Sequence, residues 1–82
     1  MIFIKIKVFA ILKDILGQDE FFFQIARGMS CQDVFTLLKN EYGSELSVLE
    51  GCFVAINGRY AGRDSRIAAG DELAILPPVS GG

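Results

Sequence analysis

Residues 30–43 read SCQDVFTLLKNEYG and carry the start and stop signals of one long helix. Ser30 is a good N-cap, and Asp33 three residues later completes a capping box in which Asp replaces the usual Glu. Gly43 follows the last helical residue, a position where glycine commonly ends a helix. Apolar residues recur at helical spacing and predict a core-facing stripe over residues 31–42: Cys31, Val34, Phe35, Leu37, Leu38 and Tyr42.

Alternating apolar residues predict two strands before this helix. Residues 2–9 place β-branched side chains on one face, which we take as the core face: Ile2, Ile4, Ile6 and Val8. Residues 20–26 alternate in the same way. Between the two strands, residues 10–16 have helical spacing, and Gly17 is expected to end a short helix there. The first half of the chain is therefore predicted to run strand, short helix, strand, long helix.

The second half is predicted to return to strands. Residues 44–51 show no regular period and are expected to be irregular, with three apolar side chains under the sheet: Leu46, Val48 and Leu49. Residues 52–57 and 59–61 are predicted to form a hairpin around Asn57-Gly58, the strongest hairpin signal in the chain. Residues 72–76 are predicted as the last strand, because the two prolines that follow cannot donate to a ladder.

This order of elements predicts an α+β fold, a β-grasp (ubiquitin-like) roll. We expect a mixed sheet with one long helix packed across it, and the first and last strands paired near its centre. Residues 1–76 would form the domain, and residues 77–82 a flexible C-terminal tail. The predicted core contains Ile4, Ile6, Val8, Val34, Leu38, Val54, Ile56, Leu73 and Ile75.

Composition restricts the function before any motif is considered. The chain has 82 residues, enough for one domain, and its 51% apolar content excludes a disordered chain. Its net charge of −2 argues against a nucleic-acid partner or an anionic membrane surface. It has no histidine and only two cysteines, Cys31 and Cys52, which argues against imidazole-based catalysis, a zinc site and a disulfide framework. We therefore expect a cytoplasmic protein with no catalytic side chain and no bound metal or cofactor.

The last six residues are the most informative segment for function. They read Pro77-Pro78-Val79-Ser80-Gly81-Gly82, so a stiff proline pair precedes two residues without side chains. Such a segment can thread a narrow channel and present the carboxylate of Gly82 to another protein. A bare carboxylate of this kind is a substrate for activation by ATP rather than an active site. A frayed terminus is the alternative interpretation of a Gly-Gly end taken alone.

The sequence resembles the small, sulfur-carrier subunits of molybdopterin synthase, a family of the β-grasp superfamily. The residues that carry this resemblance are Gly70-Asp71-Glu72-Leu73 and the run from Leu76 to Gly82, which fits the family's Pro-Pro-Val-x-Gly-Gly pattern. Two further segments are similar but more generic. They are Phe9-Ala10 before a short helix and Val54-Ala55-Ile56-Asn57 at the end of a strand.

The resemblance implies a reaction cycle carried out by partners. An adenylyltransferase similar to ubiquitin-activating enzymes would use ATP to adenylate Gly82, and a sulfur donor would convert the adenylate to a thiocarboxylate. The carrier would then dock on the large subunit of molybdopterin synthase, in a heterotetramer, and give its sulfur to cyclic pyranopterin monophosphate. The large subunit would supply the catalytic residues. Pro77, Pro78, Val79, Ser80 and Gly81 would thread the tail into that subunit.

Other functions remain open at this stage. A sulfur carrier of thiamine thiazole synthesis shares the Gly-Gly end but usually lacks the Pro-Pro-Val run. A ubiquitin-like protein modifier would be joined to lysines through Gly82. A β-grasp adaptor would do no covalent chemistry at all.

Three residues are predicted to dock on a partner. By strand parity Phe9 and Leu76 lie on the outer face of the sheet near the tail, and Tyr60 follows the hairpin turn. An exposed apolar patch beside the reactive end is a candidate docking surface, which matching hydrophobic positions of the family also serve. Cys31 and Cys52 are expected to be buried structural thiols, since free cysteine is among the most buried residue types.

Overall fold

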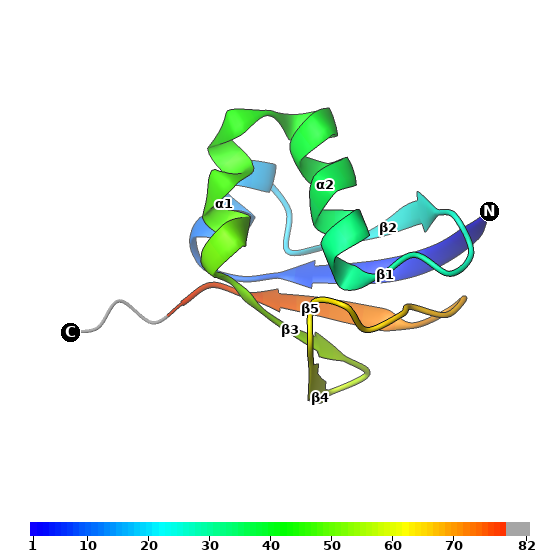
Figure 1. Cartoon of the computed structure of the whole chain (residues 1–82). Helices are drawn as coiled ribbons and strands as arrows, with labels where there is room; N and C mark the ends of the chain where they lie inside the picture. The colour runs from blue at the N-terminus through cyan, green and yellow to red at the C-terminus, as the bar shows by residue number, and fades with distance from the viewer. Residues whose placement is uncertain (79–82) are drawn as a thin grey trace.

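The computed structural model describes residues 1–78 and consists of one mixed sheet with helices on one face (Figure 1). Along the chain the elements are β1 (Ile2–Val8), α1 (Ile11–Leu16), β2 (Glu20–Ile25), α2 (Cys31–Tyr42), the 3-10 helix η1 (Ser44–Gly51), β3 (Phe53–Ile56), β4 (Arg59–Ala61) and β5 (Glu72–Leu76). Within this part of the chain, no helix is long and apolar enough to span a bilayer.

The sheet has the order β2-β1-β5-β3-β4, which puts the first and last strands side by side at its centre. β1 and β5 run parallel, with Ile6 beside Leu73, while the β1–β2, β3–β5 and β3–β4 pairs are antiparallel. Because β1 and β5 are parallel, β5 ends on the side of the molecule opposite to the N-terminus, as Figure 1 shows. The predicted mixed sheet and its central pair are confirmed.

α2 forms as its sequence predicts and packs across the sheet. The hydroxyl of Ser30 accepts a hydrogen bond from the backbone N–H of Asp33 at 3.2 Å, and Oδ2 of Asp33 accepts one from the N–H of Ser30 at 3.0 Å. This capping box satisfies two N–H groups that a helix start leaves without partners. The buried face of α2 meets the inner faces of β1, β3 and β5 in one core: Val34, Phe35, Leu38, Ile4, Ile6, Val54, Leu73 and Ile75.

The β3–β4 connection is the two-residue turn that Asn57-Gly58 predicts. Both residues have positive φ, 51° and 84°, as a type I′ hairpin turn requires. The Asn57 side chain also joins the hairpin to β5. Its Oδ1 accepts from the N–H of Glu72 at 2.9 Å, and its Nδ2 donates to Asp71 at 3.0 Å. One residue therefore fixes both the turn and the position of β3 against the central strand.

Three local predictions are wrong. Residues 44–51 are not irregular but form η1, which buries Leu46 and Leu49. Tyr42 does not belong to the core stripe, because the last turn of α2 has no buried residue and leaves Tyr42 38% exposed. Cys52 does not begin the third strand: it is the buried residue after η1, and β3 starts at Phe53.

Candidate docking face and tail exit

An apolar surface lies on the sheet face opposite α2. Val54 and Ile75 pair on the buried face, so their neighbours Phe53 and Leu76, which pair with each other, point to the outer face. Phe53 is 58% exposed, and Leu76 is half-buried. Tyr60, 81% exposed, pairs with Ala55 one row further from the end of β5. We call Phe53, Tyr60 and Leu76, with the small residues Ala55 and Ala74 between them, the outer apolar face.

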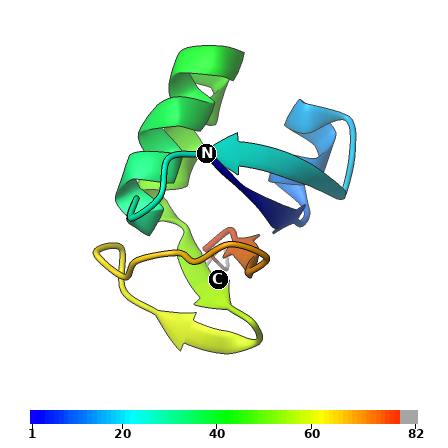
Figure 2. The same cartoon turned by 90° about the vertical axis from the view of Figure 1, so that its right-hand side faces the viewer.

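This face lies at the end of the molecule from which the tail leaves. Pro77 and Pro78 directly follow β5, and Leu76 is the last residue of that strand. A β-carbon added at Gly51 would lie 3.6 Å from Cγ of Pro78, so Pro78 passes close to the junction of η1 and β3. Figure 2, turned by 90°, shows the β3–β4 hairpin furthest from β2 in the sheet.

Two of the three predicted docking residues, Tyr60 and Leu76, belong to this face. Phe9 is 40% exposed and follows Val8, which pairs with Ile75, the neighbour of Leu76. Phe9 also lines a hollow with Lys7, Lys13 and Glu20 at the β1–α1 corner. Val79, Ser80, Gly81 and Gly82 lie outside the described residues: the candidate tail residues are therefore represented here by Pro77 and Pro78 alone.

Phe53 is a candidate docking residue that the sequence interpretation missed. It pairs with Leu76 across β3 and β5 and lines a hollow with Tyr60 on the outer apolar face. The signal was present, because strand parity with the buried Val54 sends Phe53 outward. The predicted third strand began at Cys52, and only its core-facing residues were assigned a role.

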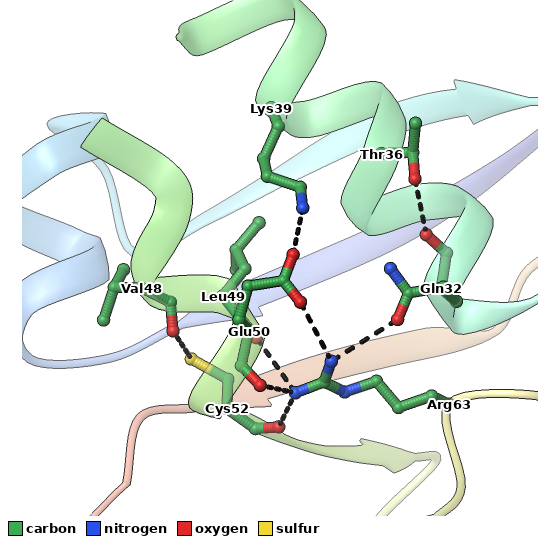
Figure 3. Close-up of polar contacts among 8 residues, drawn as sticks. All are labelled: Gln32, Thr36, Lys39, Val48, Leu49, Glu50, Cys52 and Arg63. Atoms are coloured by element: carbon green, nitrogen blue, oxygen red, sulfur yellow. Dashed lines mark hydrogen bonds and ion pairs between the residues drawn. The ribbon is translucent and has the colours of Figure 1, made fainter. Parts of the chain in front are cut away.

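Arg63 stabilises the junction of η1 and β3, which lies beside Pro78 (Figure 3). Its Nη2 donates to the carbonyl oxygens of Leu49 at 3.1 Å and Cys52 at 3.0 Å, and to that of Glu50. Leu49 and Glu50 lie in the last turn of η1, and Cys52 directly follows it; a cation is favourable at the carbonyl groups of a helix end. The guanidinium also lies 5.0 Å from the ring centre of Phe35, which couples the η1–β3 junction to α2.

Glu50 completes this polar cluster. Its carboxylate accepts a hydrogen bond from Lys39 on α2, and it lies 3.8 Å from Nη1 of Arg63 (Figure 3). The hydrogen bond from Lys39, helped by the two positive charges, lowers the pKa of Glu50 below its ordinary value. The junction beside Pro78 is therefore fixed by polar contacts from two other parts of the chain. Sequence reasoning did not foresee this cluster, because its members are far apart in the sequence.

Neither cysteine is placed for chemistry. Cys31 is fully buried and Cys52 is 4% exposed, and burial raises the pKa of both thiols. The Sγ of Cys52 donates to the carbonyl oxygen of Val48 at 3.3 Å. Both thiols therefore stay protonated at neutral pH. Among residues 1–78, no group of three or more Cys, Asp or Glu side chains is arranged to hold a metal ion.

The chain is similar to several known proteins along nearly its whole length. Residues 6–82 match the ThiS family. A curated protein of Dictyostelium discoideum, named molybdopterin synthase sulfur carrier subunit, is 38% identical over 81 residues, which cover 95% of this chain and 94% of that protein. The structure of small archaeal modifier protein 1 from Methanosarcina acetivorans is 30% identical with a TM-score of 0.75, covering 100% of this chain and 98% of that one.

A third relative is known in a complex. It belongs to the protein–protein complex of subunits 1 and 2 of molybdopterin-converting factor from Helicobacter pylori, and it shares 21% identity and a TM-score of 0.67. The match covers 99% of this chain and 100% of that one. These neighbours confirm the β-grasp fold. The family match over residues 6–82 and the full-length similarity to a curated relative lead to one conclusion: this chain belongs to the ThiS family.

Proposed function

We propose that this protein is the sulfur-carrying small subunit of a molybdopterin synthase. The observation that carries the proposal is the full-length similarity to a curated protein of that name, 38% identical over 94% of its length. The Pro-Pro-Val-Ser-Gly-Gly run at residues 77–82 supports it, because a carrier needs an end that can enter a partner's active site.

The proposed chemistry takes place at the carboxylate of Gly82. A carboxylate oxygen bonds to the α-phosphorus of ATP on a ubiquitin-activating-like adenylyltransferase, and pyrophosphate leaves. Sulfide from a sulfur donor then attacks the acyl carbon, AMP leaves, and the product is a thiocarboxylate. On the large subunit this sulfur bonds to cyclic pyranopterin monophosphate, and water then hydrolyses the acyl–sulfur bond, which leaves the sulfur on the pterin and restores the carboxylate of Gly82. The carrier supplies no catalytic side chain in this scheme, and ATP binds to the activating partner.

The outer apolar face is proposed as the surface that docks on the large subunit. Phe53, Tyr60 and Leu76 offer exposed apolar area at the end of β5, from which the tail leaves. Docking through this face therefore directs residues 77–82 toward the partner. The Helicobacter pylori relative, found in a complex with its subunit 2, supports a large-subunit partner, and the family's heterotetramer would place one carrier at each end of a large-subunit dimer.

The test is sulfur loading followed by mass spectrometry of the intact chain. The chain, its adenylyltransferase, ATP and a sulfide source are incubated, and the expected product is heavier by sulfur minus oxygen. The same spectrum of untreated protein verifies that the chain ends at Gly82. Loaded carrier, mixed with the large subunit and cyclic pyranopterin monophosphate, should lose this mass gain while molybdopterin forms.

Two variants show whether the loading depends on the tail. Deleting Gly82 should abolish loading, because it withdraws the carboxylate by about 3.3–3.6 Å, more than reacting atoms tolerate. Gly81→Val should also abolish it, because a β-branched side chain widens and stiffens the threading segment. The melting temperature of both variants should stay unchanged, since the buried core lies between Ile2 and Ile75. Normal loading of the Gly82-deleted chain would refute the proposed function.

A ubiquitin-like modifier is the second candidate, favoured by the 30% identity to small archaeal modifier protein 1. In that case Gly82 would form isopeptide bonds with lysines of other proteins. Peptides that carry a Gly-Gly remnant on lysine, found in cells with the wild-type chain but not with the Gly82-deleted chain, would support it. A carrier for thiamine thiazole synthesis would instead load normally but transfer its sulfur to thiazole synthase and not to the large subunit.

A further inference from the structure

The free edge of β2 lacks most of the features that usually protect an edge strand, and its one charged residue, Glu20, stands at its start. It is six residues long, pairs with β1 without a break in register, and contains no lysine and no proline. Its centre is Phe21-Phe22-Phe23, and Phe22 is 74% exposed. Long, flat, apolar edges of this kind pair readily with another strand. The opposite edge, β4, is only three residues long and begins with an arginine.

The backbone of β2 presents a regular set of hydrogen-bonding groups at this edge. The N–H of Val8 donates to the carbonyl of Asp19 at 2.9 Å, so the odd-numbered residues of β2 bond to β1. The N–H and C=O groups of Glu20, Phe22 and Gln24 therefore point away from the sheet. Among residues 1–78 no other strand pairs with this edge.

The charges at the ends of β2 fit a second copy of the same strand. Asp19 lies before the strand and Arg27 after it, and both side chains are exposed. Antiparallel pairing of two copies brings the acidic end of each beside the basic end of the other. Within the described residues neither side chain takes part in an ion pair, whereas Glu20 is already 3.3 Å from Lys5.

Parity and charge together select one register. Facing residues of an antiparallel pair point to the same side of the sheet, so even-numbered residues of one copy must face even-numbered residues of the other. Pairing centred on Phe22 sets Asp19 opposite Ile25 and leaves both charges without partners. Pairing centred on Phe23 sets Asp19 opposite Arg27 at both ends of the ladder. It also puts the two Phe22 side chains on a diagonal, within reach of aromatic contact.

We propose that two copies of this chain associate through antiparallel pairing of their β2 edges, centred on Phe23, to form one continuous ten-stranded sheet. The second copy covers the hollow beside β2 that Phe22, Phe23, Met29 and Leu37 line. β1 separates β5 and the outer apolar face from the β2 edge in each copy, so this pairing does not involve that face. The inference does not depend on the proposed function, and the failure of either leaves the other intact.

The first test is the association constant, measured by sedimentation equilibrium over a wide range of concentrations. The wild-type chain should show a monomer–dimer equilibrium. Phe22→Glu should weaken it at least tenfold, because it puts two carboxylates on the diagonal at the centre of the pair. Phe53→Glu is the matched control, since Phe53 is another exposed phenylalanine on the same face of the sheet but on β3, away from the β2 edge, and it should leave the association unchanged. A chain that stays monomeric, or a dimer that only Phe53→Glu disrupts, would overturn the proposal.

The second test examines register and keeps the proposal falsifiable if a phenylalanine variant folds poorly. Asp19→Arg and Arg27→Asp should each weaken self-association, because each faces like charges. An equimolar mixture of the two should associate as strongly as the wild type, since every facing pair is then opposite in sign. A mixture no stronger than its separate components would overturn this register. Amide exchange at Phe22 and Gln24 should also slow as the concentration rises, while exchange at Phe23 stays slow throughout.

Discussion

At the scale of single residues, the alternation of strands and the spacing of helices predict most of the core. Polar contacts between residues far apart in the sequence follow no such pattern. The alternation of residues 2–8 and 72–76 puts Ile4, Ile6, Leu73 and Ile75 inside, all at most 1% exposed. Arg63 has no such pattern. Its contacts go to residues 11 or more positions away, so only the folded chain brings them together.

Leu38 provides a quantitative check of the core. It is 1% exposed on the buried face of α2, so Leu38→Ala should lower the free energy of unfolding by about 2–5 kcal/mol, as truncation of buried leucines usually does. Leu37→Ala is the matched control, because Leu37 is only half-buried on the same helix and should cost clearly less. Urea titrations of both variants measure the difference. Equal losses for the two would mean that α2 packs through a different face.

At the scale of elements, the sequence predicts those elements whose defining contacts join residues close together in the chain. The capping box of α2 and the Asn57-Gly58 turn could be predicted because each involves residues no more than three positions apart. η1 could not be predicted from the sequence, since its two buried residues, Leu46 and Leu49, lie in a stretch without a sustained period. A 3-10 helix of this kind depends on contacts with its neighbours, and η1 has these from Arg63 and Lys39.

The capping box of α2 makes the free energy of unfolding depend on pH. The hydrogen bond from the Ser30 N–H, joined by that of the Ser30 side chain, lowers the pKa of Asp33 in the folded chain. A carboxyl with a lowered folded pKa stabilises the fold fully above its unfolded pKa, about 3.9, and loses this contribution as the pH falls through the folded value. Asp33→Asn should therefore be less stable than the wild type at neutral pH, and the difference should shrink in acid.

The measurement is the difference in unfolding free energy between wild type and Asp33→Asn as a function of pH. Taking the difference matters, because Lys39 also lowers the pKa of Glu50 and adds a dependence of the same sign to both proteins. Ser30→Ala serves as the control for the other half of the box and should cost about 0.5–2 kcal/mol at neutral pH. A difference for Asp33→Asn that is constant from neutral to strongly acidic pH would contradict the role given to this carboxylate.

At the scale of the whole molecule, the sequence predicts the architecture better than the candidate site. The order of strands and helices predicts the mixed sheet: α2 connects β2 to β3, which run in the same direction with β1 and β5 between them. The outer apolar face needs more than this. Tyr60 and Leu76 belong to it, and Phe9 follows Val8, the last residue of β1. Strand parity sends Phe53 outward, and the register of β3 against β5 then places it beside Leu76.

The surface variants separate the two interfaces proposed for this molecule. Leu76→Glu and Phe53→Glu should each weaken binding to the large subunit at least tenfold, because a carboxylate at the centre of an apolar interface loses its hydration without a partner. Phe9→Glu should weaken it less, since Phe9 lies at the β1–α1 corner beside Lys7 and Lys13. Phe22→Glu, the same change at the β2 edge, should leave this affinity unchanged. Calorimetric titration measures all four, with circular dichroism to check that each variant is folded. If Phe22→Glu weakened large-subunit binding while Phe53→Glu and Leu76→Glu did not, the carrier would dock through its β2 edge and the outer apolar face would need another role.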